Sequence, residues 1–282
     1  MSEETDLKKA LNKELIAELA GRGYFVSKVP PTASGKTFEA DFTKMAGRKY
    51  RFAVISCTQI GSKYQQMSHL YSFYQLCKKL KIKEVLHVGD LVDGEKIYRG
   101  QEYELFLHGA DAQMEYVIEN YPKIEGIRTR VIMGNHDESF WKTAGVNVVK
   151  EICKDRDDFE YLGDYLAFLQ MDGIKIAMMH GAGGVAYARS YKLQKIIEQM
   201  PSELKPHMLF VGHWHVTNWL PMYRNVSAFS LGAFQAQTPF LTRLGLYPEV
   251  GGYIIEIRVD DTGLVGIKPE WIPFYVMKKN DF

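Results

Sequence analysis

The sequence predicts a mixed α/β fold from residue 50 onward. Apolar runs of strand length alternate there with amphipathic stretches of helical spacing, which is typical of βαβ units with parallel strands. The second half of the chain carries apolar runs at closer spacing, so we expect more strands in that half. The sequence shows neither an internal repeat nor a low-complexity segment, either of which would indicate a different architecture.

The expected elements follow in chain order. A first strand reaches Ser56, a helix spans about residues 65–80, and a second strand ends at Val88. A second helix is expected over residues 100–121, and a third strand ends at Met133. Later strands are expected at residues 166–168, 174–179, 208–211, 226–231 and 253–258.

Residues 1–49 are expected to form a small N-terminal extension, and residues 50–282 the main domain. Leucines recur at helical spacing over residues 6–20, and a short strand and a loop follow. Such a fragment is similar to half of a winged helix-turn-helix. Two interpretations stay open: a remnant that binds DNA or a partner, and an arm that packs on the main domain.

Composition bounds the class of protein. The 282 residues allow one sizeable domain plus an extension, and the formal net charge of +1 gives no overall attraction to nucleic acid or an anionic membrane. Three widely spaced cysteines fit a reducing compartment rather than a disulfide framework. No apolar run reaches membrane-spanning length. We therefore expect a cytoplasmic protein without a membrane partner, of undetermined oligomeric state.

Four short motifs each follow an apolar run, in fixed order. They read Gly-Asp-Leu-Val-Asp-Gly at 89–94, Gly-Asn-His-Asp-Glu at 134–138, His-Gly at 180–181 and Gly-His-Trp-His at 212–215. Side chains at the ends of neighbouring strands can converge on one point. Carboxylate, amide oxygen and imidazole together suit Mn, Fe or Zn, so the motifs predict a site for a divalent metal.

These motifs resemble those of the calcineurin-like metallophosphoesterases, over most of the chain from residue 50 onward. The resemblance implies a two-sheet β-sandwich flanked by helices, and two divalent metal ions that share one aspartate. Within the family, the chain is most similar to the repair-exonuclease branch. One metal site is complete by this resemblance, with the ligands Asp90, Asn135, His180 and His213.

The first motif of the family is altered. The family has Asp-x-His after the first strand, whereas this chain has Cys57-Thr58-Gln59. The other metal site would keep Asp90 and His215 and gain Cys57 and Gln59. A metal-bound cysteine is a thiolate, so the ligand charge is preserved while the preference moves toward Zn or Fe. Two metals, one metal and a degenerate site stay open as alternatives.

The resemblance also implies the chemistry. A metal-activated water attacks phosphorus, and His136 protonates the leaving oxygen while Asp137 orients or tunes His136. A structural role for His136 is the alternative, and Asp93 either supports the site or caps a turn. The glycines after His180 form an open loop in which backbone N–H groups could meet a phosphate, or a plain flexible turn.

Candidate recognition residues follow each motif. Aromatic side chains can stack on bases and cationic ones can hold phosphates, so we expect a nucleotide-like phosphodiester as substrate, with DNA or RNA first. A small-nucleotide phosphodiesterase and a non-catalytic scaffold of the same fold are the alternatives. The apolar segment 268–275 is expected to pack on the domain or on a partner. The candidates are Lys63, Tyr64, Gln65, Gln66, Tyr98, Arg99, Gln101, Tyr187, Arg189, Tyr191, Phe234, Gln235, Gln237 and Arg243.

Overall fold

The computed structural model describes residues 37–282. The expected N-terminal helix and the fragment similar to a winged helix lie outside the described residues. Residues 37–49, which we expected in the extension, contain two short strands that pair with the sheets of the main domain. The elements are β1 Thr37–Glu39, β2 Thr43–Met45, β3 Lys49–Ile55, α2 Met67–Lys79, β4 Glu84–Val88, η1 Gln101–Tyr103, α3 Ala110–Asn120, β5 Arg128–Ile132, α4 Glu138–Ala144, α5 Val148–Asp155, β6 Phe159–Gly163, β7 Leu166–Met171, β8 Ile174–His180, α6 Tyr191–Gln199, η2 Ser202–Leu204, β9 Met208–Gly212, β10 Asn218–Tyr223, β11 Val226–Ser230, α7 Pro239–Arg243, β12 Gly251–Asp260 and β13 Gly263–Pro273.

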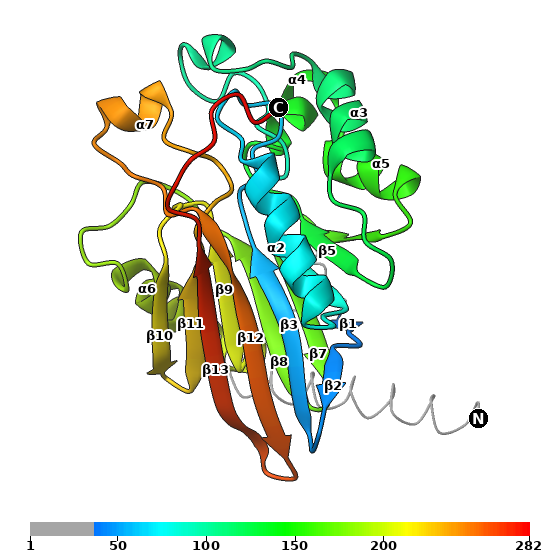
Figure 1. Ribbon diagram of the computed structural model, residues 1–282. Coiled ribbons are helices and arrows are strands. Elements are labelled where there is room, and N and C mark those ends of the chain that lie inside the picture. The colour runs from blue at the N-terminus through cyan, green and yellow to red at the C-terminus, as the bar shows by residue number, and fades with distance from the viewer. Residues whose placement is uncertain (1–36) are drawn as a thin grey trace, which may run out of the picture. The chain divides into compact units, whose positions relative to one another are not determined.

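The strands form two sheets that pack face to face (Figure 1). One sheet has the order β13-β12-β3-β4-β5-β6, with β2 paired to β3, and the other has the order β1-β7-β8-β9-β11-β10. Their facing side chains form one apolar cluster that includes Phe52, Val54, Leu86, Ile176 and Phe210. The predicted two-sheet sandwich is therefore confirmed.

Helices cover the outer faces of both sheets, as the resemblance implies. Side chains alternate along a strand, so Ala53 and Ile55 of β3 point away from the sandwich and pack against α2 and its neighbours. On the other sheet, α6 buries Leu193 and Ile197 against the β9 side chains. Both sheets are thus closed from solvent on both faces near their centres.

Parallel pairing places the site. Strands β3, β4 and β5 run parallel and in register, so their carboxyl ends meet at one edge of their sheet. Strands β8 and β9 are also parallel, and they end against the same region of the facing sheet. The loops after these five strands therefore converge (Figure 1).

One expected element needs correction, and one of two open alternatives is confirmed. The helix expected over residues 100–121 is a short 3-10 turn followed by α3, because Gly100 and Gly109 adopt positive φ angles of 94° and 86° that end helical geometry. The segment expected to pack on the domain or a partner is mainly part of strand β13. Its Trp271 packs against Tyr253 with ring centroids 5.0 Å apart, so the segment belongs to the domain.

Candidate metal centre

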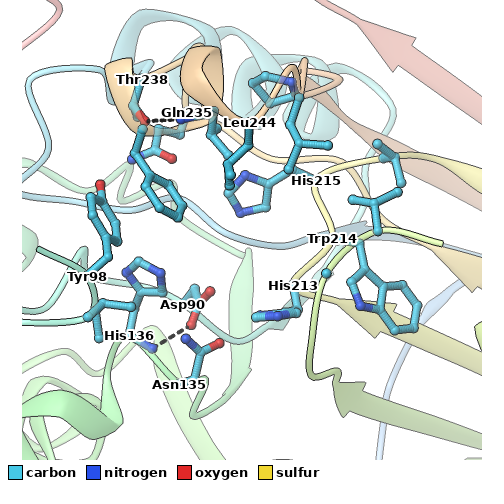
Figure 2. Close-up of a pocket in the computed structure, with 18 of the residues that line it drawn as sticks. Asp90, Tyr98, Asn135, His136, His213, Trp214, His215, Gln235, Thr238 and Leu244 are labelled. Atoms are coloured by element: carbon cyan, nitrogen blue, oxygen red, sulfur yellow. Dashed lines mark hydrogen bonds between the residues drawn. The ribbon is translucent and has the colours of Figure 1, made fainter. Parts of the chain in front are cut away.

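The loops after β3, β4, β5, β8 and β9 bring the predicted ligands together. Figure 2 shows Asp90, Asn135, His136, His213 and His215 around one pocket. Asp90 follows β4, Asn135 and His136 follow β5, and the two histidines of the last motif follow β9. The complete set of converging residues is Cys57, Gln59, Asp90, Asn135, His180, His213 and His215.

Asp90 lies at the centre of this group and is 1% exposed. One carboxylate oxygen accepts a hydrogen bond from Gln59 Nε2 at 3.1 Å and lies 3.2 Å from His180 Nε2 and 3.8 Å from Cys57 Sγ. The other oxygen accepts a hydrogen bond from the backbone N–H of His136 at 2.9 Å. Burial opposes ionisation, but the surrounding histidines outweigh it and hold the pKa of Asp90 well below its usual range.

His180 is fixed by its backbone partner. Its Nδ1 donates a hydrogen bond to the carbonyl oxygen of Val88 at 2.9 Å, which turns Nε2 toward Asn135 Oδ1 at 3.0 Å. Burial lowers the pKa of His180, but the nearby Asp90 carboxylate outweighs burial and raises it. His180 Nε2 therefore faces two oxygen atoms, at a position where a cation is favoured.

Three donor atoms of the centre are buried and lack a hydrogen-bond partner. They are Gln59 Oε1, His213 Nδ1 and His215 Nδ1, among five such side-chain atoms in residues 37–282. Burial lowers the pKa of His213 to about 4 and that of His215 to about 3, so both rings are neutral and keep a lone pair. Buried polar atoms without partners cost free energy, which a bound metal ion would recover.

The backbone at the centre is held in an unusual conformation. Cys57, Gln59, Asp90, His213 and His215 have φ angles of 52°, 49°, 57°, 90° and 55°. Residues other than glycine seldom adopt this left-handed region, and such strain is concentrated at functional sites. The altered motif shares this geometry with the residues that match the family pattern.

Cys57 is fully buried, and two polar groups approach its sulfur. The backbone N–H of His213 donates to Sγ at 3.3 Å, and the Ser56 hydroxyl, which donates to the Val88 carbonyl, lies 3.1 Å from Sγ. Burial, with Asp90 nearby, raises the pKa of the Cys57 thiol well above its usual range. A thiolate here therefore needs a cation beside it, and the His213 N–H is placed to stabilise that thiolate.

The His136 ring is oriented by Asp93, not by Asp137 as expected from the sequence. Its Nδ1 donates to the backbone carbonyl of Asp93 at 2.6 Å, and the Asp93 carboxylate lies 3.7 Å away. Gln101 and Gln235 hold that carboxylate with hydrogen bonds of 3.3 and 3.2 Å. Burial raises the pKa of Asp93 to about 6.

Asp137 instead ties two loops of the site together. Its carboxylate accepts hydrogen bonds from the backbone N–H groups of Gly134, Leu91 and Val92 at 2.8, 3.2 and 2.9 Å. Burial, with the charge of Asp90, raises the pKa of Asp137 to about 7. The position of Asp90 relative to the next loop thus depends on Asp137, although the Asp137 carboxylate is directed at the backbone.

Two glycines are required by close approach. A Cβ atom at Gly134 would lie 2.2 Å from Asp90 Oδ1, and one at Gly89 would lie 2.4 Å from His180 Nδ1. Gly89 also has a φ of 81°. The glycines of these motifs therefore make room for the ligand side chains.

A cavity of about 290 Å³ opens over the centre. Of the candidate recognition residues, Tyr98 and Gln235 line it, together with Gly183 and Gly184. The candidate cations Lys63 and Arg189 instead bond to the carbonyl of Tyr103 and to Glu249. The sequence analysis missed the apolar lining, although the Thr-Pro pair at 238–239 and the apolar run after it are a readable helix start. The apolar and aromatic lining residues are Ile97, Tyr98, Val185, Trp214, Val216, Phe240, Leu241, Leu244, Leu246, Tyr247 and Pro248.

Other histidines and cysteines lie apart from the centre. His87 is buried behind it, with Nε2 3.0 Å from the Thr58 hydroxyl, and burial lowers its pKa to about 3. His69 stacks on Phe274 with ring centroids 4.5 Å apart. Cys77 of α2 packs in the apolar core.

Comparison with known proteins defines the class. Residues 50–231 match the calcineurin-like phosphoesterase family, so the chain belongs to that family, whose members use divalent metals. The DNA polymerase II small subunit of Methanothermobacter thermautotrophicus is 26% identical over 204 residues, which cover 60% of this chain and 42% of that protein. The corresponding subunit of Archaeoglobus fulgidus is 25% identical over 220 residues, covering 63% and 44%. This chain therefore spans less than half the length of these relatives.

Solved structures are similar to this chain at low identity. An archaeal phosphodiesterase is 12% identical, with a TM-score of 0.45 over 79% of this chain and 99% of that one. A likeness of this degree supports no conclusion about function. Within residues 37–282, no helix has the length and apolar character needed to cross a membrane.

Proposed function

We propose that this chain is a metal-dependent phosphodiesterase with two divalent ions that share Asp90. The observation that carries the proposal is the set of buried donor atoms without partners around a buried carboxylate. One ion would be held by the Asn135 half-site, defined as Asn135, His180 and His213. The other would be held by the Cys57 half-site, defined as Cys57, Gln59 and His215.

The donor chemistry fits this assignment. The Asn135 half-site offers an amide oxygen and two imidazoles, which suit Mn, Fe or Zn. The Cys57 half-site offers a thiolate, an amide oxygen and an imidazole, and its thiolate favours Zn or Fe. The two half-sites would therefore differ in metal preference.

The side chains of this site would support hydrolysis in separate ways. Bound metals supply an activated water and neutralise charge on the phosphate oxygens. His136 lines the cavity, and because its Nδ1 is engaged by Asp93 its Nε2 is free to donate a proton to the leaving oxygen. Asp137 would act as a positioning residue through the backbone N–H groups that it holds.

DNA or RNA is a candidate substrate because the curated relatives are DNA polymerase II small subunits. Binding along a polynucleotide ordinarily uses a row of Lys and Arg side chains on phosphates. A small nucleotide is the second candidate, supported by a cavity of about 290 Å³ with mainly apolar walls. Both candidates place one phosphodiester at the same centre.

A non-catalytic partner subunit is the alternative from another class of function. It is favoured by the altered first motif and by the names of the relatives. A binding subunit has no need for a proton donor beside the centre. The presence of His136, oriented by its hydrogen bond to Asp93, therefore favours catalysis.

Turnover of bis-p-nitrophenyl phosphate by the metal-loaded chain tests the proposal. Asp90→Asn is expected to lower kcat at least about 100-fold, because it removes the shared charge from both half-sites. Asp261→Asn is the matched control, since Asp261 is fully exposed and, within residues 37–282, forms an ion pair with Arg48 alone. A metal-loaded wild-type chain without turnover would overturn the proposal in favour of the non-catalytic subunit.

A further inference from the structure

The cavity over the metal centre has two different parts. One part carries the polar residues of the centre, while the rest is mainly apolar and includes the rings of Tyr98, Trp214, Phe240 and Tyr247. Figure 2 shows Tyr98 and Trp214 on opposite sides of the centre. Small-molecule sites combine mostly apolar lining with a few convergent polar groups in this way. The volume of about 290 Å³ is at the small end for such sites.

One aromatic wall of the cavity, formed by Tyr98 and Phe240, is held in place before any ligand binds. The rings of Tyr98 and Phe240 stack with centroids 3.9 Å apart and an interplanar angle of 14°. Glu104, which is 7% exposed, accepts hydrogen bonds from the Tyr98 hydroxyl at 2.7 Å and from the Phe240 backbone N–H at 3.0 Å. A wall held by a buried carboxylate loses little freedom when a ligand binds, which favours affinity.

The helix that carries this wall is also anchored. The Thr238 hydroxyl caps α7 by accepting from the backbone N–H of Leu241 at 3.2 Å, and Pro239 occupies the first turn (Figure 2). Leu244, directly after α7, lines the cavity while 52% exposed. The wall thus ends in an apolar rim that solvent reaches.

The walls carry no charge suited to a second phosphate. Among the residues that the structure describes, no Lys or Arg side chain lines the cavity. Arg243 lies on α7, with its guanidinium 5.8 Å from the centroid of the Phe240 ring, outside the lining. The Lys192 ammonium, 5.1 Å from the Trp214 ring centroid, donates to the carbonyl of Ala182 and also lies outside the lining. A chain of phosphates running through the cavity would therefore meet mainly aromatic and aliphatic surface.

We infer that the cavity is a subsite for one uncharged aromatic group of the nucleobase kind, esterified to the phosphate at the metal centre. This inference rests on the proposed function and narrows its substrate to a small nucleotide or the end of a strand. Stacking on aromatic side chains recognises every base through its face, so the subsite would be tolerant of base identity.

Calorimetric titration of the metal-loaded full chain tests the subsite without turnover. Thymidine 5′-monophosphate and 2-deoxyribose 5-phosphate carry the same phosphate charge and the same sugar, and differ in the aromatic base. Thymidine 5′-monophosphate is expected to bind roughly tenfold more tightly or better, from the free energy of one base on aromatic side chains. Phe240→Ala is expected to reduce that difference below about threefold.

Two further variants show whether a change in affinity comes from the cavity. Met222→Ala, at a 66% exposed position of β10 outside the cavity, is expected to keep the full difference. Leu244→Ala removes a half-exposed side chain at the rim of the cavity and is expected to reduce the difference in affinity between the two phosphates. This variant tests the subsite independently if Phe240→Ala fails to fold.

The results that would contradict the subsite differ from those that would contradict the proposed hydrolysis. Equal binding of the two phosphates by the wild type would overturn the inference, and so would tighter binding of octyl phosphate than of thymidine 5′-monophosphate. Turnover of bis-p-nitrophenyl phosphate is scored separately. A binding difference without turnover would support the subsite and contradict the hydrolysis proposal, whereas turnover without a binding difference would do the reverse.

Discussion

The Asn135 half-site and the Cys57 half-site differ in how their donors are held. In the Asn135 half-site, His180 is fixed by the Val88 carbonyl and points at Asn135. In the Cys57 half-site, Gln59 Oε1 and His215 Nδ1 are buried without partners among the described residues, although the Gln59 amide group donates to Asp90. His213 Nδ1 of the Asn135 half-site is also buried without a partner among these residues. The two half-sites therefore differ at His180 and Asn135, which hydrogen bonds preorganise, while Cys57 and His215 are held mainly by their backbone.

The backbone of the Cys57 half-site is as specialised as that of its neighbour. Cys57 and Gln59 have φ angles of 52° and 49°, close to the 57° of Asp90 and the 55° of His215. A loop that had lost its site would gain stability by relaxing such strain. A changed ligand set can therefore keep the loop geometry that a metal needs.

The largest expected effect tests chemistry beside the Asn135 half-site. His136→Gln should lower turnover of a thymidine dinucleotide about 100-fold or more, because its leaving alkoxide needs a proton. Turnover of bis-p-nitrophenyl phosphate should fall much less, since p-nitrophenolate leaves without protonation. Steady-state kinetics on both substrates measure this split.

The control for His136 is His108→Gln, at an exposed position whose ring lies 3.7 Å from the Glu95 carboxylate. It should leave both substrates unaffected. Equal losses on the two substrates in His136→Gln would show that the ring does not act as the proton donor.

The next largest effect tests the metal preference that the thiolate gives the Cys57 half-site. Cys57→Asp with Gln59→His restores the ligand types of the family pattern and removes the thiolate. The ratio of Mn-supported to Zn-supported activity should rise on the order of tenfold, because carboxylate suits Mn better than thiolate does. An unchanged ratio would mean that Cys57 does not set the metal preference.

The smallest effect concerns support of the Cys57 loop from the C-terminal residues. Asp281 accepts a hydrogen bond from the Ser68 backbone N–H at 2.7 Å at the start of α2, and the Gln65 and Gln66 side chains bond to the backbone of residues 278–281. Asp281→Ala should lower the free energy of unfolding by about 1 kcal/mol, the usual cost of losing a helix cap. Denaturant titration beside the exposed control Asp261→Ala checks this, and equal stability of the two variants would contradict it.

Much of the fold and the grouping of candidate ligands could be predicted from the sequence. Apolar runs directly before Asp90, Asn135 and His213 predict strand ends, and parallel strand ends meet at one edge. Contacts over long separations could not be predicted. The support of His136 by Asp93 joins residues 43 positions apart, and nothing local distinguishes Asp93 from Asp137 as its partner.

The apolar wall escaped prediction for a similar reason. An apolar run after the last motif is compatible with core packing as well as with a cavity wall, and only the tertiary contacts of Glu104 show which one it forms. Strand β13 was also missed, since its burial alternates weakly along an edge of the sheet.

The most direct test of the two-metal account is the metal content per chain, measured by elemental analysis of protein purified without added metal. Cys57→Ala is compared with Cys77→Ala, because both thiols are fully buried but Cys77 lies in the apolar core. The account predicts two metals per chain in the wild type and in Cys77→Ala, and one in Cys57→Ala. Two metals in Cys57→Ala, or fewer than two in the wild type after supplementation with Zn, would contradict it.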